Sequence, residues 1–282
     1  MEEQRLLGGN AGGAVLAGGS VRRATGPWTP AIHALLRHLE SRGFDGAPRA
    51  LGFDEQGREV LSFLPGTTIG LARPWPRWVH SDDALVQVGA WLRRYHDVVA
   101  DFLPPAGTRW RMSSAPWRPG EVVGHNDAAP YNAVWAPAAI GAGALGAGGL
   151  GHGVASAASL VGFIDWDFAG PCPPVRDLAF VAFSWVPLHA RDIVLAEGFT
   201  RFADRPQRLR LLLDAYGYTG TVDELLAAVS VRISDHIEGL RALATAGDPV
   251  FTRLVADGAI DGLNRALSQL REDASDFGIT AG

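Results

Sequence analysis

Cysteine, a basic surface pattern and a long apolar run are absent or nearly absent from this 282-residue sequence. The single cysteine, Cys172, excludes a disulfide framework and a cysteine-based zinc site within one chain, and it fits a reducing compartment best. A net charge of −5 with a pI near 5.9 provides no basic stripe of the kind that nucleic-acid binding uses. We therefore expect no nucleic-acid partner.

No segment is expected to be a secretion signal or a membrane span. The N-terminal stretch "MEEQRLLGGN" starts with acidic residues and has neither the basic nor the apolar region of a signal peptide. The apolar run "LAFVAFSWVPL" at residues 178–188 is too short to cross a bilayer, because about 20 apolar residues are needed. We interpret this run as core and expect a cytoplasmic protein without a membrane partner.

Residues 1–65 predict a short, glycine-rich first lobe that contains both strands and a helix. Ile32, Leu35, Leu36 and Leu39 follow the i, i+3, i+4, i+7 spacing of one helical face, and Gly43 follows as a stop signal. The runs "ALGF" and "EVLSFL" flank "DEQG", which is typical of a hairpin turn. This lobe is therefore predicted to be α+β.

Residues 66–282 predict a larger and mainly helical second lobe, which begins after the Pro65-Gly66 break. Ser81 suits the N-cap of a first long helix, and the acidic residues after it suit the positive end of the helix dipole. Further helices are expected at residues 189–203, 205–216, 222–246 and 249–273. The fold class is therefore α+β with two lobes.

A glycine- and alanine-rich tract at residues 136–160 interrupts the second lobe. Its many glycines disfavour a helix, since each costs about 1 kcal/mol relative to alanine in a helix interior. We expect a flexible surface loop. The tract separates "YNAVW" from "LVGFIDWDF", and these two apolar runs are predicted to be neighbouring strands joined by the loop.

The stretch "GHNDAAPYNAVW" places His125, Asp127 and Asn132 in the spacing His-x-Asp-x-x-x-x-Asn. This is the catalytic-loop pattern of phosphoryl transfer, in which the aspartate accepts the proton of the substrate hydroxyl and the asparagine holds a metal. If the two apolar runs pair, Asp165 comes close to Asn132, and such oxygen ligands suit Mg²⁺. The alternative is an ordinary turn, because aspartate and asparagine bond readily to their own backbone.

With "GFIDWDFAGPCPPVRDLA" added, the sequence resembles the aminoglycoside phosphotransferase-like family, small-molecule kinases with a protein-kinase-like fold. The resemblance covers most of the chain. It implies that Asp127 is the catalytic base or the group that orients the substrate hydroxyl, that His125 braces the loop, and that Asn132 and Asp165 bind Mg²⁺. Asp167 is implied to touch a second metal or a water molecule.

The resemblance also implies an interlobe hinge and an anchor for the catalytic loop. The backbone of Ser62, Phe63 and Leu64 would face the adenine ring of a nucleotide. Asp177 would either anchor the catalytic loop or cap the following helix, and capping is the role that its position before "LAFVAF" favours.

The first lobe departs from the family pattern in its phosphate-binding residues. A lysine or arginine is usual on the third strand, and "GGSVRRATG" offers Arg22 or Arg23 instead of a lysine. The helix that usually supplies a glutamate partner has Ile32 and His33 near that place. The glycine-rich run is not followed by Gly-Lys-Ser/Thr, so it does not form a P-loop.

These features favour a kinase that moves the γ-phosphoryl group of ATP or GTP, with Mg²⁺, to a hydroxyl of a small molecule. The family suggests an aminoglycoside-like antibiotic or an amino alcohol. Two rival functions stay open: a non-catalytic nucleotide- or antibiotic-binding protein of the immunity type, and a metal-dependent hydrolase that uses Asp127, Asp165 and Asp167. Four acidic residues could serve a cationic acceptor, although a solvated helix face is their commoner role; they are Asp235, Glu238, Asp257 and Asp261.

Overall fold

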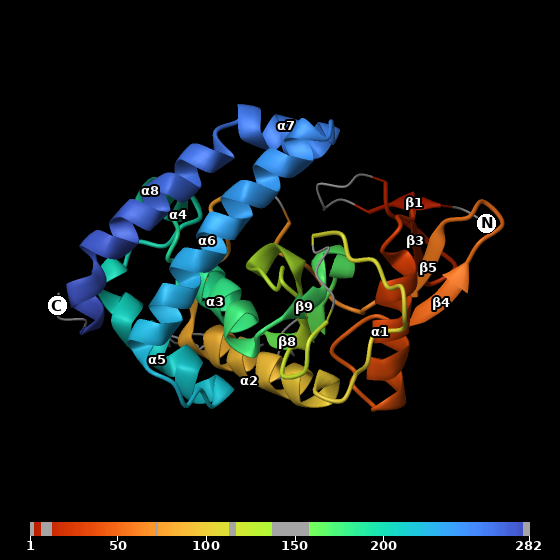
Figure 1. The fold of residues 1–282 in the computed structure, drawn as a ribbon, viewed down its shortest axis with the longest axis horizontal. Helices are drawn as coiled ribbons and strands as arrows, with labels where there is room; N and C mark the ends of the chain where they lie inside the picture. Colours follow the sequence, from red (N-terminus) through yellow and green to blue (C-terminus); the bar gives the residue numbers. More distant parts are fainter. Residues whose placement is uncertain (1–2, 7–12, 71–72, 113–116, 137–157, 279–282) are drawn as a thin grey trace, which may run out of the picture.

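The computed structural model describes residues 3–6, 13–70, 73–112, 117–136 and 158–278. An antiparallel sheet with one helix forms the N-terminal part, and the C-terminal part is mainly helical, which confirms the predicted α+β class (Figure 1). Nearly all of the tract expected to be a flexible loop, residues 137–157, lies outside the described residues. Within the described part of the chain, no helix is long and apolar enough to cross a membrane.

The N-terminal sheet is antiparallel and has the strand order β1-β2-β3-β5-β4. Its strands are β1 (Gln4–Arg5), β2 (Val15–Ala17), β3 (Ser20–Arg23), β4 (Ala50–Phe53) and β5 (Glu59–Ser62). Gly18 and Gly19 join β2 to β3, and both have the positive φ that a two-residue hairpin loop requires. The predicted hairpin around "DEQG" is confirmed as the pair β4 and β5.

Helix α1 (Thr29–Ser41) packs its predicted apolar face into the core, and Ile32, Leu35, Leu36 and Leu39 are all buried. Gly43 follows with a φ of 69°, a conformation in which glycine ends a helix without strain. Both the helix and its end agree with the sequence prediction.

After β5 the chain crosses to the C-terminal part through Gly66 and Thr67. Thr67 exchanges two backbone hydrogen bonds of 2.9 Å with Trp135. A Cβ atom on Gly66 would lie 2.7 Å from the carbonyl oxygen of Trp135, so only glycine allows this close approach. The division of the lobes between residues 65 and 66 falls at this crossing, and we retain it as a proposal.

The C-terminal part contains seven α-helices within the described residues. They are α2 (Asp82–Val99), α3 (Pro174–Trp185), α4 (Arg191–Ala196), α5 (Arg205–Tyr216), α6 (Val222–Thr245), α7 (Pro249–Ala256) and α8 (Ala259–Glu272). Ser81 caps α2 as predicted, accepting a hydrogen bond from the backbone N–H of Ala84 at 3.1 Å. The helix expected at 249–273 is instead two helices, because Gly258 has a left-handed backbone with a φ of 85°.

Two small antiparallel pairs lie between the N-terminal sheet and the outer helices (Figure 1). Strand β6 (Val122–Gly124) pairs with β9 (Gly170–Cys172), and β7 (Ala133–Ala136) pairs with β8 (Ser159–Phe163). The predicted pairing of the runs on either side of the glycine- and alanine-rich tract is therefore confirmed. All four strands meet near the segment that carries Asp127.

Candidate functional site

The loop from β6 to β7 holds Asp127 in a network of local hydrogen bonds. The side-chain amide of Asn132 donates to Oδ2 of Asp127 at 2.8 Å, and the Tyr131 hydroxyl donates to Oδ1 at 3.0 Å. Asn132 belongs to the short 3₁₀ turn η2 (Pro130–Asn132), which brings it back toward Asp127. Two residues of the predicted motif are thus in direct contact.

The environment of Asp127 changes its proton affinity. Burial raises the pKa of this carboxyl to about 7, and the nearby charge of Asp165 raises it further, against the hydrogen bonds from Tyr131 and Asn132. A carboxylate with a pKa near the working pH is well matched to accept a proton from a hydroxyl. The loop therefore holds a carboxylate that suits general-base chemistry.

Asp177, in the first turn of α3, fixes the backbone of this loop. Its carboxylate is fully buried and accepts hydrogen bonds from the backbone N–H groups of His125 at 2.9 Å and Asn126 at 2.8 Å. His96 on α2 contacts the same carboxylate through Nε2 at 3.1 Å. The favoured expectation of a helix cap is wrong, because the residue bonds the loop from β6 to β7 and not the helix N-terminus.

His125 is enclosed by aromatic side chains beneath the loop. Its ring centroid lies 4.4 Å from that of Trp166, and its Nδ1 accepts a hydrogen bond of 3.3 Å from the backbone N–H of Asp127. Burial lowers the pKa of His125 to about 4, so the ring is neutral at pH 7. This position supports a bracing role for His125.

Asp165 follows β8 and begins the 3₁₀ turn η3 (Trp166–Phe168) with a left-handed backbone, φ 61° and ψ 65°. The backbone N–H of Ile164 bonds the carbonyl of Asn132 at 3.0 Å, which fixes Asp165 beside the catalytic loop. A left-handed conformation is uncommon for aspartate, and such strain is often found where a side chain must be aimed at a site.

Of the two candidate arginines, only Arg23 reaches this site. Its guanidinium donates to Oδ1 of Asp165 at 3.0 Å and also contacts Asp167. Arg22 lies on the opposite face of β3, where it approaches Asp54 at 3.7 Å. The two faces of a strand alternate with each residue, so neighbouring arginines point apart.

The acidic partner of Arg23 is Glu59 on β5, which the sequence analysis did not identify. Glu59 lies opposite Arg23 in the β3–β5 register, is almost fully buried, and bonds Arg23 directly. His33 on α1 contacts the other oxygen of Glu59 at 3.0 Å. The helix therefore supplies a histidine and the strand supplies the acid. The strand register alone could have revealed this pair.

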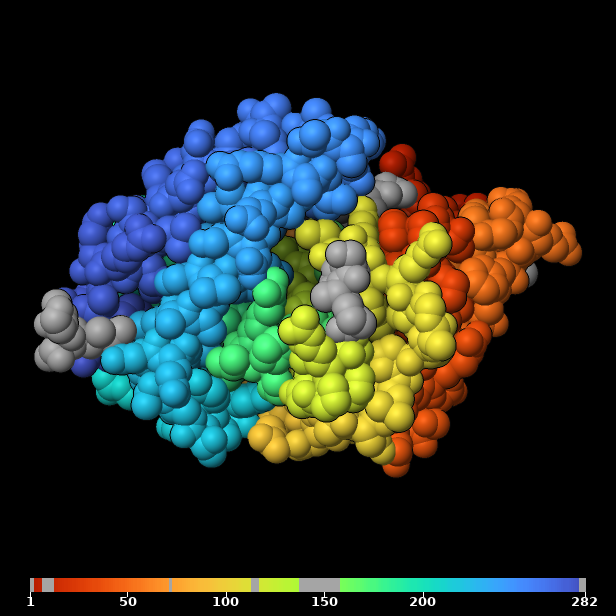
Figure 2. Space-filling view, in the orientation of Figure 1, coloured from red at the N-terminus to blue at the C-terminus, as the bar shows by residue number. Residues whose placement is uncertain are grey.

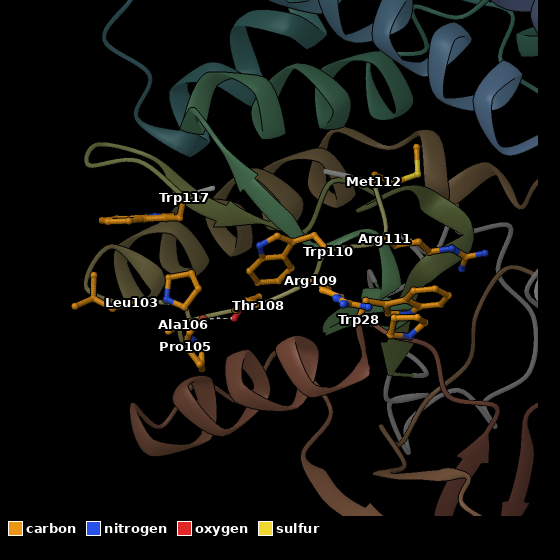
Figure 3. A pocket seen from close by; sticks show the side chains of 13 residues that line it. Trp28, Leu103, Pro105, Ala106, Thr108, Arg109, Trp110, Arg111, Met112 and Trp117 are labelled. Atoms are coloured by element: carbon orange, nitrogen blue, oxygen red, sulfur yellow. Dashed lines mark hydrogen bonds between the residues drawn. The ribbon is translucent and has the colours of Figure 1, made fainter. Parts of the chain in front are cut away.

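Arg111 is a second residue that the sequence analysis missed. Its guanidinium lies 3.3 Å from Oδ2 of Asp167 and 4.6 Å from the ring centroid of Trp28 (Figure 3). It also lies over Phe168 at 5.0 Å. No motif surrounds Arg111 in the sequence, so only the folded chain brings it to Asp167.

The donors near Asp127 suit a hard cation such as Mg²⁺. Asn132 uses its amide nitrogen to bond Asp127, which leaves its oxygen without a hydrogen bond from any described residue. Asp165 has one oxygen bonded to Arg23 and its side chain is 23% exposed. Asp167 is held by two arginines and fits less well. No group of three histidine, cysteine or acidic side chains forms a metal site in the described ranges.

The proposed hinge residues begin at Ser62, the last residue of β5, and continue through Phe63 and Leu64. The backbone N–H of Ser62 bonds the carbonyl of Arg49 at 2.9 Å, which ties it to the sheet. Phe63 is 38% exposed. Within the described chain, the backbone groups of Phe63 and Leu64 make no hydrogen bond. Their role toward a nucleotide base stays a prediction.

A cavity of about 520 Å³ opens beside Asp127, and Figure 2 shows the hollow between α6 and the segments drawn in yellow and green. Asp235 and Glu238 line it, whereas Asp257 and Asp261 lie on exposed surface elsewhere. A second cavity, of about 960 Å³, is lined by the segment after α2 and by Trp28 and Trp117 (Figure 3). The first cavity is the one that can place a molecule against Asp127.

Comparison with known proteins identifies the family. The model of the phosphotransferase enzyme family matches residues 22–212. The trifolitoxin immunity protein of Rhizobium leguminosarum bv. trifolii is 36% identical over 234 residues, which is 80% of this chain and 80% of that protein.

Solved structures share the whole fold at low sequence identity. Aminoglycoside 2'-phosphotransferase-IIIa in its GDP complex is 14% identical with a TM-score of 0.54, over 98% of this chain and 93% of that chain. A choline/ethanolamine kinase family protein from Mesorhizobium loti is 15% identical with a TM-score of 0.53, over 96% and 93%. The expected two-lobed, kinase-like fold is confirmed, and the chain belongs to the phosphotransferase enzyme family.

Proposed function

We propose that this protein transfers the γ-phosphoryl group of ATP or GTP to a hydroxyl group of a small molecule. The observation that carries the proposal is Asp127, which is held by Asn132 and Tyr131, lies beside Asp165 and faces a cavity. Family membership supports the reaction class. Related folds have been solved with GDP and with AMP-PNP, which supports a nucleotide as the donor.

Each group has a separate task in this proposal. The acceptor oxygen forms a bond to the γ-phosphorus, the bond from that phosphorus to the β–γ bridging oxygen breaks, and the nucleoside diphosphate leaves. Asp127 accepts the proton of the acceptor hydroxyl, and Arg23 moves from Asp165 and Asp167 to the phosphate oxygens. Asn132 and Asp165 would hold Mg²⁺, whose contribution is to neutralise phosphate charge.

Replacement of the proposed base tests the reaction. Asp127→Asn keeps the size of the side chain and removes its ability to accept a proton, so the rate of nucleotide-dependent phosphorylation should fall by about 100-fold or more. The measurement is release of nucleoside diphosphate across a panel of hydroxylated amines, acids and antibiotics. Asp257→Asn, at an exposed position, is the control and should leave the rate unchanged. Equal rates for Asp127→Asn and the wild type would exclude Asp127 as the base.

A second candidate function is binding without catalysis, as an immunity-type protein would use. The ion pairs of Arg23 with Asp165 and Asp167 favour it, because they occupy the groups that nucleotide and metal would need. The similarity to an immunity protein is compatible with it. Calorimetry with Mg²⁺ and ATP or GTP separates the two: no nucleotide binding, with tight binding of an antibiotic, would favour this second function. A hydrolase that uses Asp167 as a metal ligand fits poorly, since two arginines hold that carboxylate.

A further inference from the structure

The cavity beside Asp127 contains a cationic side chain that forms no ion pair with a described residue. Arg232 on α6 lines this cavity together with Asp127. Among the described residues, no carboxylate lies within ion-pair distance of its guanidinium, and Nε is buried without a hydrogen-bond partner. Burial lowers the pKa of Arg232, and the positive charge of Arg176 lowers it further, against the opposing effect of the Asp127 and Asp177 carboxylates.

The contacts that Arg232 does make hold it in place without neutralising it. One terminal nitrogen donates to the carbonyl of Asn126 at 2.9 Å, and the guanidinium lies 4.8 Å from the ring centroid of Phe180. The opposite charges of Asp127 and Asp177 act on Arg232 without forming an ion pair with it. A buried guanidinium without an ion pair is well placed to bind an anionic ligand at contact distance.

Two acidic residues of the cavity already have local partners, whereas Glu238 forms no ion pair with a described residue. Asp235 pairs with Arg176 at 2.6 Å, and the carboxylate of Glu121 accepts a hydrogen bond of 2.9 Å from the backbone N–H of Arg118. His236 adds no charge at neutral pH, since burial lowers its pKa to about 3. Arg232 is the cation of this cavity whose charge acts on Asp127.

The position of Arg232 points to the acceptor and not to the nucleotide. Arg232 bonds the residue directly before Asp127, so a group bound to it would lie close to the hydroxyl that Asp127 contacts. The described lining of this cavity does not include Arg23, Asp165 or Asp167, which are the groups proposed to face the phosphates. Arg232 therefore lies on the acceptor side of Asp127, and Arg23 lies outside this cavity on the side proposed for the phosphates.

We propose that Arg232 binds a carboxylate of the acceptor, so that the substrate is a hydroxylated carboxylic acid and not a purely cationic amine. This inference rests on the proposed function, since it names the class of acceptor for the same site. A charged hydrogen bond in a buried site accounts for a preference of about 10- to 100-fold for an acid over its amide.

Matched acceptors test this preference in the full-length protein. Glycerate is compared with glyceramide and N-acetylserine with N-acetylserinamide, and choline represents a cationic alcohol. Nucleotide-dependent turnover is measured as kcat/KM, and binding is measured by calorimetry in the presence of AMP-PNP and Mg²⁺. We expect each acid to exceed its amide by about 10-fold or more in both measurements. Equal values for acid and amide, the absence of binding by both, or a preference for choline would overturn the inference.

Variants on the same helix identify the residue responsible. Arg232→Gln should bring the acid-to-amide ratio close to one, and Arg232→Lys should restore part of it because the charge returns. Arg241→Gln, on exposed surface of α6, should keep the full ratio. A ratio unchanged by Arg232→Gln would contradict the proposal, as would a change confined to the KM of the nucleotide, which would assign Arg232 to the phosphates.

The outcomes separate this inference from the proposed function. If acids bind in an Arg232-dependent manner and no nucleotide is consumed, the carboxylate site stands and the phosphotransferase function fails. If nucleotide is consumed with amides or choline as readily as with acids, and Asp127→Asn abolishes this consumption, the function stands and the carboxylate site is wrong.

Discussion

The pKa values of two residues in the loop from β6 to β7 respond to burial in opposite directions. The same loss of water raises the pKa of the Asp127 carboxyl to about 7 and lowers that of the His125 imidazole to about 4. Burial disfavours the charged form of each group. As pH rises, the carboxyl of Asp127 therefore loses its proton at a higher pH than usual, and the imidazole of His125 loses its proton at a lower pH than usual. One loop thereby presents a carboxylate that can exchange a proton near neutral pH and a histidine that stays neutral.

The buried neutral state of His125 predicts a pH-dependent stability. Its folded pKa of about 4 lies below the ordinary value of 6.5, so the unfolded chain binds the proton more readily and stability falls as pH decreases from about 6.5 to about 4. His125→Asn cannot bind this proton. The gap in unfolding free energy between wild type and variant should narrow by about 2 kcal/mol from pH 7 to pH 5 in urea titrations. A gap independent of pH would show that His125 is charged or exposed.

The absence of lysine near residue 22 has a simpler explanation than lost function. The 282-residue sequence contains no lysine, and all 25 of its basic Lys/Arg positions are arginine. An arginine at position 23 is therefore the basic residue that this composition supplies. Its contacts with Asp165 and Asp167 support a role at the site despite the change of residue type.

Helix α3 supplies the carboxylate that holds the backbone of the loop from β6 to β7. Asp177 in its first turn accepts two backbone N–H groups of the loop, while the helix begins without a side-chain cap. The helix thus acts as a rigid support that sets the direction of the loop. A carboxylate with two oxygens is needed for both bonds.

Removal of one of these oxygens predicts a local effect. Asp177→Asn leaves one acceptor and places an amide donor opposite a backbone N–H, so the free energy of unfolding should fall by about 3 kcal/mol and the amides of His125 and Asn126 should exchange faster. Hydrogen exchange and urea unfolding measure the two effects. Asp223→Asn, a first-turn residue of α6 that is exposed, should change stability by less than about 1 kcal/mol. Similar losses in both variants would mean that only the helix dipole is affected.

Elements with regular local patterns were predictable, and contacts between elements were not. The face of α1 and the β4–β5 hairpin follow from apolar spacing and turn residues within a few positions. The break between α7 and α8 was missed because the apolar spacing continues across Gly258. Glu59 and Arg111 were missed because their partners lie far away in the sequence.

For the whole molecule, Arg23 is a direct link between the N-terminal sheet and the site in the C-terminal part. It bonds Glu59 within the sheet and reaches Asp165 and Asp167 across the junction. The charge of the Arg23 guanidinium stabilises all three of these carboxylates. Arg111 contacts the other carboxylate oxygen of Asp167, so Asp167 is shared between Arg23 and Arg111.

Loss of this link predicts a large change in stability. Arg23→Gln leaves three carboxylates without their shared cation, and the free energy of unfolding should decrease by about 3–5 kcal/mol. Arg22→Gln is the neighbouring control, and loss of its pair with Asp54 at 3.7 Å should cost less than about 1 kcal/mol. Urea unfolding at pH 7 compares them. Equal losses would show that the link between the two parts contributes little.

The sequence by itself determined the family, the α+β class and the motif of His125, Asp127 and Asn132, because these depend on residue types at short, regular spacings. Only the tertiary structure decided that Arg23 and not Arg22 faces the site, and that Glu59 is its partner. The physical reason is that the pleat of β3 sends neighbouring side chains to opposite faces of the sheet. The register of β3 with β5 then sets which charged side chains on one face lie close enough to form an ion pair.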